Sequence, residues 1–168
     1  MDNDLKNRFY HKFEVECLGP DGELKWSIVD HNLVVNTGLD DILDKYWKGS
    51  GYTSSHFVGL MDSTPTVAAA DTMASHAGWT EIQDYTEGTR EALTLGAVAS
   101  QSVDNSASKA SYSVNATVTI GGSFITTNST KGGTTGTLIG AVAFAGGDKS
   151  ADSGDTLNVT VTLSTSSS

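Results

Sequence analysis

The sequence predicts a mainly β protein, an antiparallel β-sandwich or jelly-roll-like fold with one short helix and an N-terminal arm and hairpin. Three observations lead to this prediction. Charged residues make up only 18% of the 168 residues, so few are present for long surface helices. Ser, Thr, Gly and Asn take their place, and this mixture favours strands and tight turns. Apolar and polar residues alternate in short segments that recur about every ten residues.

The first elements we expect are two strands joined by a tight turn. Apolar and charged side chains alternate over residues 9–18, which is the period of a half-buried strand. Gly19-Pro20-Asp21-Gly22 is a turn sequence, because Pro presets φ and Gly accepts a positive φ. Alternation resumes over residues 23–30. We therefore expect an N-terminal arm and β-hairpin in residues 1–30 and a β-sandwich domain in residues 31–168.

One helix is expected at about residues 37–47. Apolar residues recur at helical spacing from Leu39 to Tyr46, with aspartates on the other face. Thr37 has the position of an N-cap, and Asp40 follows three residues later as in a variant of the capping box.

The remainder of the chain is expected to be largely β. Further strands are predicted at 56–61, 79–85, 89–98, 111–121, 123–129, 137–144 and 156–163, with a helical turn around 71–75. The segment 137–144 is nearly all apolar, which predicts burial on both faces. We expect 146–154 to be a loop and the low-complexity tail 164–168 to fray.

Charge and hydropathy exclude two classes of partner. The net charge is −10, and the ten basic residues are scattered, whereas a protein that grips phosphates needs clustered Lys and Arg. Direct binding of nucleic acid is therefore not expected. No segment reaches the roughly 20 apolar residues of a membrane span, and the first residues do not resemble a signal peptide. We expect folding in a reducing cytoplasm and no membrane partner.

No group of residues predicts an active site or a metal centre. Cys17 is the only cysteine; the simpler interpretation is a small buried residue, and the alternative is a reactive nucleophile. The four histidines are far apart in sequence, and a zinc site needs converging ligands. A site made of His56, His76, Asp62 and Asp71 is kept as a minor alternative. We expect no catalytic residue, no cofactor and no metal.

Aromatic residues outside apolar strand interiors are the better functional signal, because such side chains concentrate binding energy at interfaces. The alternative for the loop-flanking members is that they close the edge of the core. The candidate protein-interface residues are Phe9, Tyr10, Tyr46, Trp47, Tyr52, Trp79 and Tyr85.

Several sequence blocks resemble a group of tailed-bacteriophage structural proteins. The blocks are Val35-Asn36-Thr37-Gly38-Leu39, Gly59-Leu60-Met61-Asp62, the run DTMASHAGWTE at 71–81, the run KGGTTGTL at 131–138 and the run SGDTLNVT at 153–160. The resemblance covers about residues 33–163 and implies a virion protein, with a capsid cement or decoration protein as the first choice. It brings no catalytic residues with it.

Three hypotheses follow. The first is a non-enzymatic cement protein that bridges neighbouring major capsid subunits, as a dimer or trimer, in a virion assembled in the host cytoplasm. The second is a tail, neck or fibre component of the virion, with a possible host-surface contact. The third is a carbohydrate-binding or glycan-cleaving sandwich, in which Trp79 and Tyr85 stack on sugar rings and Glu81 serves as an acid.

Overall fold

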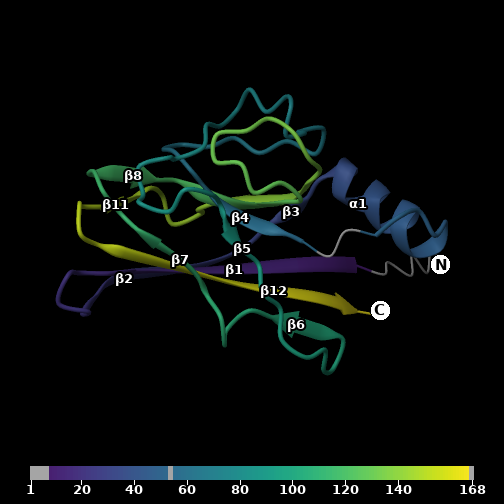
Figure 1. Cartoon of the computed structure of the whole chain (residues 1–168), viewed down its shortest axis with the longest axis horizontal. Helices are drawn as coiled ribbons and strands as arrows, with labels where there is room; N and C mark the ends of the chain where they lie inside the picture. Colours follow the sequence, from purple (N-terminus) through teal and green to yellow (C-terminus); the bar gives the residue numbers. More distant parts are fainter. Residues whose placement is uncertain (1–7, 53–54, 167–168) are drawn as a thin grey trace, which may run out of the picture.

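The computed structural model describes residues 8–52 and 55–166 and shows a mainly β fold with one short helix, so the predicted fold class is confirmed (Figure 1). The first antiparallel sheet has the order β2 (Leu24–His31), β1 (Arg8–Leu18), β12 (Thr156–Ser166) and β6 (Ser102–Asp104), with β7 (Ala110–Ser113) also paired to β12. The second has the order β3 (Leu33–Val34), β10 (Leu138–Ala143), β9 (Gly122–Thr126), β4 (Phe57–Met61) and β5 (Glu91–Ala92). A third, smaller sheet pairs β11 (Lys149–Ala151) with β8 (Val118–Ile120).

The predicted hairpin is present, and β1 continues into the centre of the first sheet. Every residue of β1 has a partner on β12, from Arg8 opposite Ser166 to Leu18 opposite Thr156. On its other side β1 pairs with β2. The hairpin is therefore joined to the end of the chain by one continuous sheet. Of the predicted arm, residues 1–7 lie outside the described residues.

The core lies between the two large sheets. Phe13 of β1 and Val159 of β12 are buried on the first sheet, and Val58 of β4 and Ile125 of β9 meet them from the second. The segment predicted to be buried on both faces is β10, whose residues are buried or half-buried throughout. Alternating apolar side chains on both sheets thus fill one space, as in a sandwich.

The helix is found, but its start differs from the prediction. α1 (Asn36–Ile42) begins one residue earlier and continues as one π-helical turn, η1 (Leu43–Trp47). The N-cap residue is Val35, and no side chain caps the first turn. The Thr37 hydroxyl instead donates to the Leu138 carbonyl of β10 at 2.7 Å. The helix is therefore fixed to the second sheet by the group that was expected to cap it.

Three predictions of local structure are wrong. Within the described residues, 79–85 form no strand and make only isolated bridges at Glu81 and Tyr85. Residues 71–75 form turns without a helical turn. The tail expected to fray belongs to β12 as far as Ser166, because its backbone pairs with β1 and β6.

The boundaries of three other segments also change. Only β5 is regular within 89–98. The predicted strand 111–121 is divided into β7, which pairs with β12, and β8, which pairs with β11. Its two halves belong to different sheets, which alternation along one segment does not reveal. The loop predicted at 146–154 contains β11, the partner of β8, and β6 was not predicted at all.

A buried ion pair holds together the region 79–98, in which β5 is the one regular strand described. Arg90 is 1% exposed, and its Nε and Nη2 each donate to one oxygen of Glu81 at 2.8 Å. The same guanidinium donates to the carbonyls of Asn128 and Gly133. Arg90 therefore joins three loop segments, and each of its hydrogen bonds compensates part of the cost of burying the charge.

We predict that Arg90→Leu lowers the free energy of unfolding by about 3–5 kcal/mol, because the Glu81 carboxylate is left buried and unpaired. Urea denaturation measures this loss. Lys109→Leu is the matched control: it removes the more exposed ion pair with Glu16 and should cost no more than about 1 kcal/mol. Equal losses for the two variants would show that the buried pair has no special structural role.

Candidate functional site

Exposed apolar side chains gather at one end of the molecule, around the helix. Among the described residues, seven of the twelve exposed large hydrophobic side chains belong to this group, which we call the apolar end. They are Phe9, Leu39, Leu43, Tyr46, Trp47, Tyr52 and Val98. The apolar end lies opposite the turn that joins β1 to β2 along the long axis (Figure 1). An exposed cluster of this kind marks an interaction surface more often than isolated exposed residues do.

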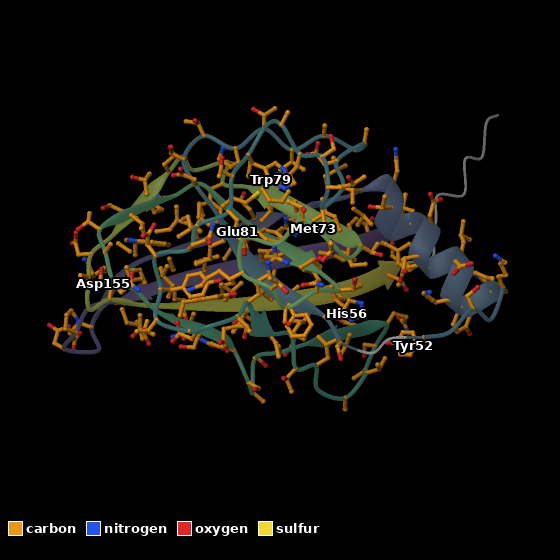
Figure 2. The ribbon with its side chains drawn as sticks, turned by 45° about the horizontal axis from the view of Figure 1, so that its top comes forward. Tyr52, His56, Met73, Trp79, Glu81 and Asp155 are labelled. Carbon is orange, nitrogen blue, oxygen red and sulfur yellow. The ribbon has the colours of Figure 1, made fainter. Side chains whose placement is uncertain are left out.

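Between the helix and the near end of the first sheet lies a concave space of about 910 Å³, which we call the apolar cavity. Phe9 lines it from β1 and Leu163 from β12, while Tyr46 and Trp47 line it from the helix. Tyr52, in the segment that follows the helix, closes part of the rim, and Figure 2 shows it on the helix side of the molecule together with His56. The cavity is thus formed by segments from both ends of the chain and from its middle.

The helix projects because only its first turn is closely held. Besides the Thr37 bond, Gly38 packs so near β10 that a Cβ there would collide with the Ile139 carbonyl. Farther along, Leu43 is 58% exposed and Tyr46 and Trp47 are 78% and 76% exposed. Their rings contact each other edge to face, with centroids 5.3 Å apart. The apolar face of the helix, which would normally face a core, is therefore largely turned to solvent.

The π-helical turn η1 lies where this exposure is greatest. Isolated π turns inside helices are rare and are frequent at functional sites. Asp44 stabilises the turn by accepting from the Ser50 hydroxyl at 2.8 Å and from Lys48 Nζ at 3.1 Å. Chiefly the Ser50 hydrogen bond, and then that from Lys48, lower the pKa of Asp44 below its usual value. These two hydrogen bonds connect the turn to the residues that directly follow it.

The structure brings four of the seven predicted interface residues together and separates the other three. Phe9, Tyr46, Trp47 and Tyr52 all line the apolar cavity. Tyr10 is 37% exposed but follows Phe9 on the same strand, so it points to the opposite face of the sheet. Both residues pair with β12, which agrees with the strand predicted over residues 9–18.

Trp79 is buried. Of the two interpretations given for the loop-flanking aromatic residues, closing the edge of the core is the one that fits it. The indole is 7% exposed, stacks on His76 with centroids 3.8 Å apart, and donates from Nε1 to Asp71. Glu81, in the middle of the molecule beside Trp79 in Figure 2, is engaged by Arg90. This arrangement leaves neither a free aromatic face for a sugar ring nor a free carboxyl beside one.

Tyr85 is also a core residue. Its ring is 2% exposed, packs edge to face on Tyr112 and lies under Lys131 Nζ at 4.1 Å. Burial raises the pKa of the phenol above its usual value. Neither Trp79 nor Tyr85 presents enough surface to anchor a partner, and both are corrected from interface candidates to core residues.

Cys17 is buried, which confirms the simpler interpretation. Its Sγ lies 3.5 Å from Asp155 Oδ2 in the interior. Burial, followed by the negative charge of Asp155, raises the pKa of the thiol to about 12. Since the thiolate is the nucleophile, this thiol is unreactive in the folded chain.

The residues of the minor zinc alternative are engaged elsewhere. His76 Nδ1 lies 3.0 Å from the Trp79 carbonyl, and Asp71 accepts from the Trp79 indole. Over residues 8–52 and 55–166, no three His, Cys, Asp or Glu side chains converge as they would around a metal ion. In the same ranges no helix is long and apolar enough to cross a membrane.

His11 is a cavity residue that the sequence analysis did not identify. It lies on the same face of β1 as Phe9 and is 5% exposed. The Asn32 side-chain amide donates to its Nδ1 at 2.8 Å. Burial, and then the nearby His56, lower the pKa of His11 to about 4. The imidazole is therefore neutral near pH 7 and belongs to the apolar wall. Its burial could have been predicted from the sequence, because it occupies a buried position in the alternation of β1.

Comparisons with models of known protein families, with curated proteins and with solved structures find no match for this chain. The assignment of a function therefore depends on the geometry of the apolar end and on the sequence blocks described above.

We predict that His11 makes the fold less stable as the pH falls. An unfolded histidine binds its proton near pH 6.5, whereas His11 in the folded chain does so near 4. Between these values the unfolded state holds more protons, so the free energy of unfolding should decrease by about 2 kcal/mol from about pH 7 to about pH 5 through this residue.

Urea denaturation across this pH range tests the prediction by comparing the chain with His11→Gln. The variant lacks the titrating group, so its stability should fall less steeply over the same interval, whatever its stability at neutral pH. Identical slopes for both proteins would contradict the prediction, because the carboxylates are common to them.

Proposed function

We propose that this chain is a non-enzymatic structural protein of a tailed-bacteriophage virion and acts as a capsid cement protein. The apolar end is the surface through which it binds neighbouring protein subunits. In this role the chain covers apolar area at junctions between major capsid subunits and holds them together.

The observation that carries the proposal is the concentration of exposed aromatic surface at one end of the molecule. Tyr46, Trp47 and Tyr52 are each more than 70% exposed. Aromatic side chains that are rigid and clustered around a depression are typical anchors of protein interfaces. Their exposure in a separate chain is unfavourable, and contact with another subunit removes it.

The apolar cavity supports a protein partner that inserts an apolar side chain or short segment. Its walls are mainly aromatic and aliphatic, with Phe9 and Leu163 on the sheet side and Tyr46 on the helix side. The buried His11 contributes a neutral wall, because its pKa is held near 4. Each 100 Å² of apolar surface covered there would stabilise the contact by about 2.5 kcal/mol before the cost of association.

The charge of the chain supports an outer position in the particle. With a net charge of −10, the protein is repelled by packaged DNA and has no basic cluster in its sequence to offset this repulsion. The sequence blocks that resemble phage structural proteins agree with a virion setting. Many copies, each making the same contact, would add their effects and stiffen the shell.

The proposal predicts that the apolar cavity is required for binding to capsids. The purified chain should co-sediment with capsids of the encoding phage that have been stripped of it. Tyr52→Asp places a charge on the cavity rim and should weaken binding by about thirtyfold, equivalent to about 2 kcal/mol at a central aromatic contact. Because Tyr52 is 71% exposed, the substitution should leave the fold intact.

Leu24→Asp is the matched control for this experiment. Leu24 is 57% exposed, lies at the start of β2 beside the hairpin turn, and is far from the helix along the long axis (Figure 1). Its substitution should leave binding unchanged. Absence of binding by the unaltered chain, or equal binding by all three proteins, would contradict the proposal. Immunogold labelling confined to tails would replace the cement position with a tail position.

A further inference from the structure

The outer surface of the helix carries an apolar row that lies mostly outside the cavity and meets it at Trp47. Leu39, Leu43 and Trp47 follow one another at intervals of four residues, so they lie along one side of the helix. All three are exposed, from 39% at Leu39 to 76% at Trp47. Leu39 and Leu43 do not line the apolar cavity. This row, which we call the outer row, therefore needs a partner of its own.

A charged row runs beside the outer row and changes sign along its length. It consists of Asp40, Asp44 and Lys48, again at intervals of four residues. Asp44 and Lys48 do lie on one side, since Lys48 Nζ is 3.1 Å from Asp44 Oδ1. Asp44 is also 3.5 Å from Lys45. Within the described residues, the Asp40 side chain makes no ion pair or hydrogen bond, so the charged row starts with an unpaired acid and ends with a base.

We infer that the outer row binds the outer row of a second copy of this chain, with the two helices antiparallel about a two-fold axis near Leu43. In this arrangement Leu43 packs on Leu43 of the second copy, and Leu39 packs near Trp47 of the second copy. The charged rows then meet in opposite directions. Asp40 of each copy lies near Lys48 of the other, which gives two equivalent ion pairs.

Charge complementarity selects a second copy in this orientation. A two-fold contact uses the same patch twice, so the patch must be complementary to itself. Reversing the helix direction achieves this, because the acidic start faces the basic end. Parallel helices would place Asp40 against Asp40 and Lys48 against Lys48. Two chains of net charge −10 repel each other, so a local attraction at the contact matters for pairing.

The inference deepens the proposed function and rests on it, because it names one partner of the apolar end. It uses only Trp47 of the cavity wall, leaves the part lined by Phe9, Tyr52 and Leu163 for the capsid subunit, and gives each assembly two cavities. The two claims fail separately. Tyr52→Asp should lose capsid binding but keep self-association, whereas Leu43→Asp should lose self-association. A monomeric chain that still binds capsids would overturn only the inference.

The test uses a charge exchange between two variants of the full chain, followed by sedimentation equilibrium. The unaltered protein should have twice the 17.5 kDa mass of one chain. Asp40→Lys gives each charged row a basic residue at both ends, and Lys48→Asp gives it an acidic residue at both ends. Each variant alone should self-associate at least about tenfold more weakly, since like charges now meet. Mixed in equal amounts, they should form a heterodimer with affinity within about threefold of the original, because both ion pairs return with reversed sign.

Matched controls carry the same charge changes at sites outside the helix. Asp84→Lys and Lys149→Asp should neither reduce self-association alone nor show a specific gain on mixing. A monomeric unaltered chain would overturn the inference. So would a dimer that Leu43→Asp leaves intact, or a mixture of Asp40→Lys and Lys48→Asp that associates no better than its components. Circular dichroism of each variant identifies any loss of fold, and Leu43→Asp provides a second disruption that does not depend on Lys48.

Discussion

The pairing of β1 with β12 is the constraint on which the remainder of the structure depends. These are the longest strands described, with eleven residues each, and they join the start of the chain to its end along their full length. Their inner faces supply six of the nineteen buried residues of the main core cluster, and β2, β6 and β7 attach to them. The same inner face continues past the core to Phe9 and Leu163, which form the sheet side of the apolar cavity. Core and candidate surface are therefore two parts of one ladder.

The helix completes the surface because its closest attachment to the sandwich is at its first turn. Thr37 and Gly38 fix the first turn to β10, while the later turns extend beyond the sandwich. An amphipathic helix normally turns its apolar face to the core, and here that face borders the cavity on one side and solvent on the other. A polar residue at position 47 would avoid exposing apolar surface there, yet the position holds the most exposed of the three tryptophans. In the proposed role, assembly with other subunits gives this exposure a function.

The parts of the fold that depend on local periodicity were predictable, and the parts that depend on distant contacts were not. Alternation in the hairpin and the apolar run of β10 identified strands, because one buried face or two buried faces leave a direct mark on sequence. The bond from Thr37 to Leu138 joins residues 101 positions apart, so the sequence favoured a local cap. Alternation over 79–85 likewise concealed the Glu81–Arg90 pair. Aromatic content indicated an interface, but only packing separated exposed Trp47 from buried Trp79.

The central claim, that the apolar end is covered by other subunits, is tested most directly by acrylamide quenching of Trp47 fluorescence. The contribution of Trp47 is the difference between the chain and Trp47→Phe, since Trp79 is buried and Trp26 is partly buried. In solution dilute enough to keep the chain monomeric, Trp47, at 76% exposure, should be quenched readily. In assembled particles its quenching constant should fall by at least about threefold, as expected for an aromatic anchor within a water-excluded contact. Particles that contain the chain but leave Trp47 as accessible as in dilute solution would contradict the claim.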